Sequence, residues 1–90
     1  MLVTLAEMKQ YLRVDSSDDD VLIQTLITTA ESLCLDVART DLDTFSVFPV
    51  AKVSVLYAVA YLYEHREEAD HKKLLLTLRA MLFGIREEAF

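Results

Sequence analysis

Residues 53–63 read Val-Ser-Val-Leu-Tyr-Ala-Val-Ala-Tyr-Leu-Tyr, an apolar run broken only by one serine and the hydroxyl groups of three tyrosines. Pro49 precedes the run and suits the first turn of a helix, where its missing N–H costs nothing, so the sequence predicts a helix over residues 49–67. A helix without a polar side must be buried on more than one side. The run is too short to cross a bilayer, and a chain of 90 residues can hardly surround it alone. We therefore expect part of this helix to contact other subunits.

The rest of the chain predicts an all-α fold, a small bundle of about four helices in a single domain covering residues 1–90. One glycine and one proline leave little scope for a turn-rich β fold. Apolar residues recur at helical spacing on both sides of the central run, as on the buried face of an amphipathic helix. The four helices are expected at about 4–13, 18–38, 49–67 and 71–83.

Polar residues mark where these helices begin and end. Thr4-Leu-Ala-Glu7 reads as a capping box, Asp70 is a candidate cap for the last helix, and Gly84 suits a left-handed C-terminal cap. The candidate caps for the second helix are Ser16, Ser17 and Asp18. The helical period is lost over residues 39–48, which are expected to form a loop with a short extended piece over 45–48.

Size and charge favour association with partner subunits. A chain this short buries only roughly 60% of its unfolded surface, so its stability is marginal without a supplement. Cys34 is the only cysteine, which excludes an internal disulfide and fits a reducing compartment. The net charge of −6 argues against a generic nucleic-acid binder, which needs lysines and arginines to displace counterions. With no basic segment leading into an apolar one, we expect no signal peptide and a soluble, cytoplasmic protein.

Candidate chemical sites have simpler structural explanations. The acidic run 15–20 lacks the glycine and the glutamate that a calcium loop starting at Asp15 would need, so it is interpreted as helix capping. His65 and His71 match no metal-binding spacing on one helix face. Cys34 lies on the apolar stripe of its helix, where a thiol packs as a small hydrophobe. We therefore expect no catalytic residue, no cofactor, no metal and no enzyme.

Tyrosines on the apolar helix are the candidates for a subunit contact. Tyr61 and Tyr63 point about 200° apart around a helix, so both cannot face one core. Tyrosine and arginine are also enriched at protein interfaces. The predicted interface residues are Tyr57, Tyr61, Leu62, Tyr63 and Arg66.

Three groups of residues together resemble the phage head–tail connector proteins, which are also described as DNA-packaging proteins. The N-terminal group is Leu5-x-x-x-x-x-Tyr11-Leu12-Arg13-Val14-Asp15, followed by an acidic run and by Leu22-Ile23 and Leu26-Ile27. The later groups are Pro49-Val50 with Ala60-Tyr61-Leu62-Tyr63-Glu64-x-Arg66-Glu67, and Leu78-Arg79-x-Met81-Leu82-Phe83-Gly84-Ile85-Arg86. The resemblance covers essentially the whole chain, but residues 39–48 depart from the aromatic and glycine-rich loop that is commoner in the family.

The resemblance implies a non-catalytic head-completion protein in the virion, assembled from subunits in the host cytoplasm. Family members form an adaptor ring beneath the portal, between the DNA-filled head and the tail or its stopper protein. The implied partners are further copies of the chain, the portal protein, a stopper or tail-completion protein, and genomic DNA that passes without sequence-specific binding. The segment 83–90 or the loop 39–48 would contact neighbouring components, with Phe83, Arg86 and Phe90 as the candidate residues.

A second hypothesis is a small helical regulatory protein, such as a dimeric antitoxin or a DNA-binding adaptor. It requires a basic recognition helix, and the only candidates are Lys72, Lys73 and Arg79, with acidic residues nearby. An acidic chain fits a conduit for DNA better, because a negatively charged lumen repels the passing duplex.

Overall fold

The computed structural model describes residues 2–65 and 71–83, and these contain five helices and no strand. The helices are α1 (Leu5–Leu12), α2 (Asp20–Ala38), α3 (Leu42–Phe45), α4 (Pro49–Glu64) and α5 (His71–Met81). The predicted all-α bundle is confirmed, and the four longer helices begin and end within three residues of the expected positions. Asp70 and Gly84, the expected caps at the two ends of α5, lie outside the described residues.

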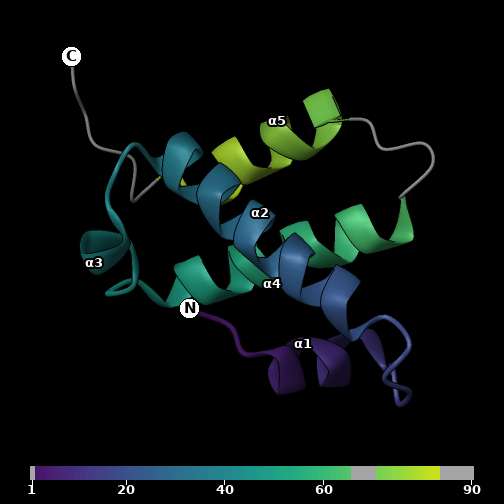
Figure 1. Ribbon diagram of the computed structural model, residues 1–90. Coiled ribbons are helices and arrows are strands. Elements are labelled where there is room, and N and C mark those ends of the chain that lie inside the picture. Colours follow the sequence, from purple (N-terminus) through teal and green to yellow (C-terminus); the bar gives the residue numbers. More distant parts are fainter. Residues whose placement is uncertain (1, 66–70, 84–90) are drawn as a thin grey trace.

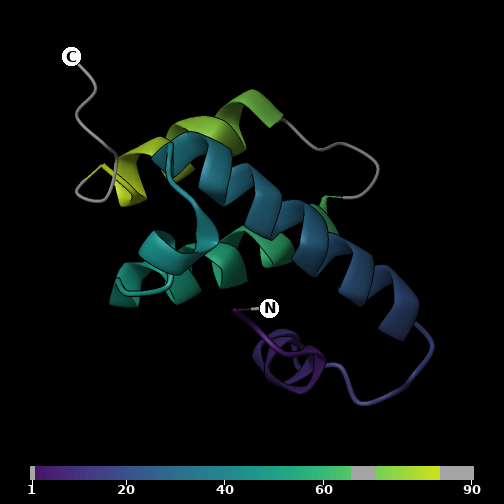
Figure 2. The same cartoon turned by 60° about the vertical axis from the view of Figure 1, so that its left-hand side comes forward.

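The two longest helices, α2 and α4, pack against each other and form the centre of the fold. In two views α1 lies on one side of this pair and α5 on the other, while α3 sits at the end where α4 begins (Figure 1, Figure 2). Helix α2 contacts every other helix of the described chain. By length and apolar composition alone, α2 could also cross a membrane. The core helix of a soluble protein meets the same two criteria.

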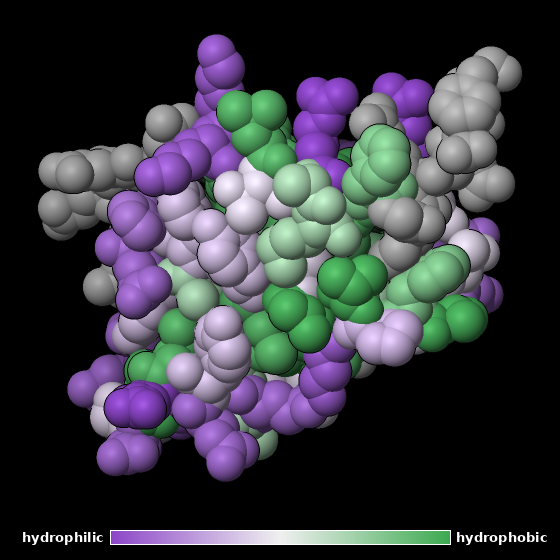
Figure 3. Space-filling model, turned by 180° about the vertical axis from the view of Figure 1, so that it is seen from behind, coloured by the Kyte–Doolittle hydropathy of each residue, from purple (hydrophilic) through white to green (hydrophobic). Residues whose placement is uncertain are grey.

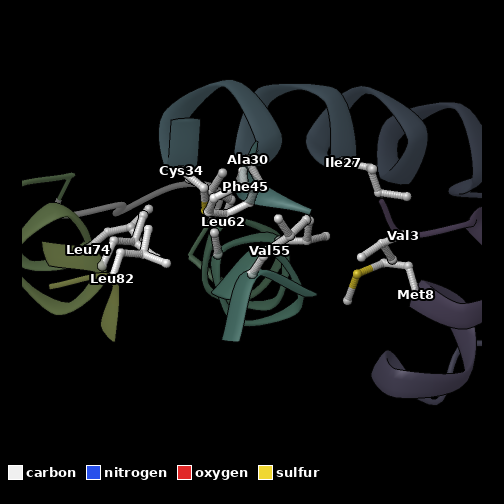
Figure 4. Packing of buried hydrophobic residues seen from close by; sticks show 14 of the residues in the cluster. Val3, Met8, Ile27, Ala30, Cys34, Phe45, Val55, Leu62, Leu74 and Leu82 are labelled. Atoms are coloured by element: carbon white, nitrogen blue, oxygen red, sulfur yellow. The ribbon is translucent and has the colours of Figure 1, made fainter. Parts of the chain in front are cut away.

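A single cluster of buried side chains joins all five helices. It extends from Val3 and Met8 at the α1 end, through Ile27 of α2, to Leu74 and Leu82 at the α5 end (Figure 4). The other members are Ile23, Ala30, Cys34, Ala38, Phe45, Ala51, Val55, Ala58, Val59, Leu62 and Leu78. Burial of this apolar surface, at roughly 25 cal/mol per Å², is the main force that holds the helices together.

Helix α1 begins as the sequence predicts. The Thr4 hydroxyl accepts a hydrogen bond from the Glu7 backbone N–H at 3.1 Å, and the Thr4 N–H donates to the Glu7 carboxylate at 3.0 Å. Ion pairs then tie α1 to both central helices, from Lys9 to Asp20 at 2.7 Å and from Glu7 to Lys52. The ammonium of Lys52 and the hydrogen bond within the capping box keep the pKa of Glu7 below its ordinary value.

The N-cap of α2 is Asp19, so the prediction of Ser16, Ser17 or Asp18 was wrong. The Asp19 side chain makes no capping hydrogen bond and instead accepts one from the Tyr63 hydroxyl at 2.6 Å. Local capping rules would have the Asp19 side chain bind the backbone at the start of α2. It binds Tyr63 instead, a residue 44 positions further along the chain.

The prediction of an extended piece over residues 45–48 was also wrong, because Phe45 ends the short helix α3. The Asp41 carboxylate caps this helix by accepting a hydrogen bond from the Thr44 N–H at 2.8 Å, which lowers the pKa of Asp41. The Phe45 ring is fully buried, and Figure 4 shows it among the core side chains. One turn of helix is too short to show a period in the sequence, so only the tertiary contact of Phe45 reveals it.

The fold covers more of α4 than the sequence suggests. Helices α1, α2 and α5 all contact it, and six of its residues are buried: Ala51, Ser54, Val55, Ala58, Val59 and Leu62. The chain thus buries one side of α4 by itself. Its other residues are partly or fully exposed, and only these could contact another subunit.

Cys34 is fully buried in the core, as its place on the apolar stripe of α2 predicts. Burial, with a smaller contribution from the nearby Glu31 carboxylate, raises the pKa of the Cys34 thiol to about 11. An unfolded cysteine has a pKa of about 8.5. The folded state therefore favours the neutral thiol, and this contribution to stability is complete below about pH 8.5 and is lost as the pH rises towards 11.

We expect the free energy of unfolding to fall more steeply between pH 8.5 and about 11 in the native protein than in a Cys34→Ala variant. Urea titrations at several pH values measure both slopes, and all other titratable side chains are the same in the two proteins. Parallel pH profiles would contradict the assignment.

Candidate interaction surface

One side of α4 is only partly covered by the other helices and is mostly apolar. At 100° per residue, the six buried residues of α4 occupy one side of the helix. The opposite side, here called the outer face of α4, consists of Val53, Leu56, Tyr57 and Ala60, with the exposed carboxylate of Glu64 at its C-terminal end. Val53 is 54% exposed, and the other three are partly buried. Figure 3 shows hydrophobic side chains gathered across the middle of the molecule seen from behind, with hydrophilic ones around the lower rim.

The outer face leads into an open groove of about 650 Å³ between the end of α1, the second half of α4 and the start of α5. We call it the tyrosine groove, and its lining residues are Tyr11, Leu12, Arg13, Tyr57, Ala60, Tyr61, Glu64, His65 and Lys73. This volume lies within the range of pockets that take several side chains or a small ligand.

Aromatic rings line the α4 side of the groove. The ring centroids of Tyr57 and Tyr61 lie 6.4 Å apart, and the imidazole of His65 stacks on Tyr61 with centroids 4.3 Å apart. The His65 Nδ1 also lies 2.9 Å from the Tyr61 carbonyl oxygen, which fixes the orientation of the imidazole. The α4 side of the groove is thus aromatic, and aromatic residues are enriched at protein interfaces.

The α1 side of the groove depends on a backbone conformation at Arg13. This residue follows the last turn of α1 with φ of 60°, and its N–H donates to the carbonyl groups of Lys9 and Gln10. The left-handed conformation ends the helix and places Arg13 at the rim beside Tyr11, which is 52% exposed.

The structure separates the predicted interface residues. It brings Tyr57 and Tyr61 together in the tyrosine groove, whereas Tyr63 lies on another side of α4, where it binds Asp19. Leu62 is only 6% exposed and belongs to the core, so within the single chain it supports the fold and offers no surface. Arg66 lies outside the described residues.

Of the candidate contacts near the C-terminus, the structure describes only Phe83. Its side chain is 77% exposed just after α5. Arg86 and Phe90 lie outside the described residues.

Sequence reasoning missed the contributions of α1 and α5 to the groove. Tyr11 and Arg13 lie beside Tyr57 only because the chain folds, since more than 40 positions separate them in the sequence, and Lys73 reaches the groove from the next helix, α5. The exposed tyrosine at the end of an otherwise apolar stripe is the one local signal that could have indicated Tyr11.

The acidic residues between α1 and α2 serve the fold. Asp20 pairs with Lys9, and Asp19 accepts the hydrogen bond from Tyr63. Within residues 2–65 and 71–83, no group of three or more histidine, cysteine, aspartate or glutamate residues is placed to hold a metal ion.

Comparison with known proteins identifies one family. The family model described as phage gp6-like head–tail connector protein matches residues 2–86. No curated protein and no solved structure matches the chain.

Proposed function

Since the chain belongs to the family of phage gp6-like head–tail connector proteins, which are structural proteins of the phage particle, we propose that it forms a ring beneath the portal. This ring joins the DNA-filled head to the tail and has no catalytic activity. Its place is the head–tail junction of the virion, reached after subunits fold in the host cytoplasm.

The observation that supports a ring most directly is the outer face of α4. A monomeric protein rarely leaves a continuous apolar strip on a central helix unless another molecule covers it. Here the strip continues into the tyrosine groove, so aromatic and aliphatic side chains form one surface along α4. A neighbouring subunit in a ring would bury it.

The proposed neighbours of the ring are the portal protein on one side and a stopper or tail-completion protein on the other. Phe83 is a candidate contact, because a phenylalanine that is 77% exposed gains from burial against a partner. The net charge of −6 suits a channel through which genomic DNA passes without sequence-specific binding.

Sizing by light scattering followed by negative-stain microscopy tests this proposal, with the protein alone and mixed with its cognate portal. We expect rings, in isolation or on the portal. A protein that stays monomeric or dimeric at high concentration and on the portal, and that binds duplex DNA tightly, would overturn the connector proposal.

A further inference from the structure

We propose that the corner around α3 of one subunit docks into the tyrosine groove of the next subunit, in a head-to-tail contact. This inference rests on the proposed self-assembly and adds the two surfaces that carry it. The corner comprises residues 41–48 and is called the α3 corner below.

The α3 corner projects apolar side chains from a rigid frame. Val47 is 76% exposed, and Leu42 and Phe48 are also exposed. The buried ring of Phe45 anchors the corner to the core, and hydrogen bonds from the Thr44 N–H to Asp41 and from the Ser46 hydroxyl to the Asp43 carbonyl oxygen close its turns. A pre-ordered projection loses little conformational entropy on docking.

The corner and the groove cannot meet within one subunit. The corner precedes the first residue of α4, whereas the groove is built around Tyr57, Tyr61 and His65. From Pro49 to Tyr61 the helix rises by roughly 18 Å, at 1.5 Å per residue. A projection at one end and a hollow at the other end of the same helix are the two unlike halves of a heterologous contact, the type that generates closed rings.

Charge favours a second copy of the chain as the occupant of the groove. Two chains of net charge −6 repel each other unless unlike charges meet at the contact. The α3 corner carries Asp41 and Asp43 and no basic residue. Among the described residues that line the groove, two are basic, Arg13 and Lys73, and one is a carboxylate, Glu64. Apolar side chains would thus enter an aromatic groove while carboxylates face its basic rim.

Disulfide trapping tests this contact directly. In a Val47→Cys/Ala60→Cys variant, one cysteine lies on the corner and the other in the groove, and the native Cys34 stays buried and inert. Mild oxidation should give a ladder of covalent oligomers, whereas each single-cysteine variant should give no product beyond a dimer. A Val47→Cys/Gln24→Cys variant is the matched control, because Gln24 is exposed on α2 away from the groove lining, and it should give no ladder above random collision.

Mixing two blocked variants supplies a second measurement. Val47→Lys should disable the corner and Ala60→Glu should disable the groove, so each variant alone loses self-association. Mixed in equal amounts, they should form a dimer that cannot grow, because each subunit keeps one intact half of the contact. Circular dichroism of each variant checks that both remain folded.

The outcomes separate this inference from the proposed function. Rings seen by microscopy without a ladder from the Val47/Ala60 pair would overturn the contact between the α3 corner and the tyrosine groove and leave the connector proposal standing. A Phe90→Cys/Ala60→Cys variant that forms a bond within one chain, with no ladder from the first pair, would assign the groove to the chain's own C-terminal segment and also overturn it. A ladder without rings on the portal would support the contact and count against the proposed ring.

Discussion

Replacing Phe45 by alanine should lower the free energy of unfolding by about 3–5 kcal/mol, the usual cost of deleting a buried aromatic ring. Phe45 is the largest fully buried side chain among the described residues. Domains of this size have total stabilities of roughly 5–13 kcal/mol, so the variant should be largely unfolded at modest urea concentrations. Urea denaturation followed by circular dichroism measures the loss.

Leu42→Ala is the matched control for this prediction. Leu42 belongs to the same short helix but is exposed, so its replacement should cost less than about 1 kcal/mol. Equal stabilities for the two variants would mean that α3 does not anchor the segment between α2 and α4 through Phe45.

Replacing both Tyr57 and Tyr61 by alanine should abolish assembly while leaving the monomer folded. Truncating an interface tyrosine at a hot spot costs about 2 kcal/mol or more, so the double variant should lose roughly 1000-fold in subunit affinity, at about 1.4 kcal/mol per tenfold. Both side chains are only partly buried in the monomer, so the loss of folding stability should be about 1 kcal/mol for each. Light scattering reports the assembly, and a thermal melt reports the fold.

Leu62→Ala on the same helix should give the opposite result. Leu62 lies in the core, so its truncation should lower the free energy of unfolding by about 2–5 kcal/mol. At temperatures where this variant remains folded, it should still assemble. If the double tyrosine variant assembles like the native protein, the tyrosine groove is not a subunit interface.

Much of the fold could be predicted because its signals are local. The capping box at Thr4 and the proline that opens α4 act within one turn of their helices, so they have the same effect in any tertiary context. Apolar residues at helical spacing predicted α2 and α5 for the same reason, since this spacing depends only on the helix itself and marks the side that must be buried.

The candidate site was only half predictable. The angle between Tyr61 and Tyr63 follows from helix geometry alone, and the structure places the two side chains in different surroundings, one in the groove and the other on Asp19. Which of them reaches a free surface depends on where the other helices pack. Leu62 was predicted to lie at the interface because Tyr61 and Tyr63 flank it in the sequence. The other helices of the bundle pack around α4 and bury it within the single chain.

The apolar run over residues 53–63 by itself determined that this protein has a helix with more than one side to bury. In a helix the position of each residue fixes the direction of its side chain, so a run of apolar residues places apolar side chains on several sides. Only the tertiary structure decided that the bundle buries one side of this helix and leaves the outer face of α4 partly exposed. It also decided that α3 lies at the start of α4 and the tyrosine groove along its second half. These features depend on contacts between segments far apart in the chain, such as the hydrogen bond between Tyr63 and Asp19, and such contacts cannot be predicted from the local pattern of residues.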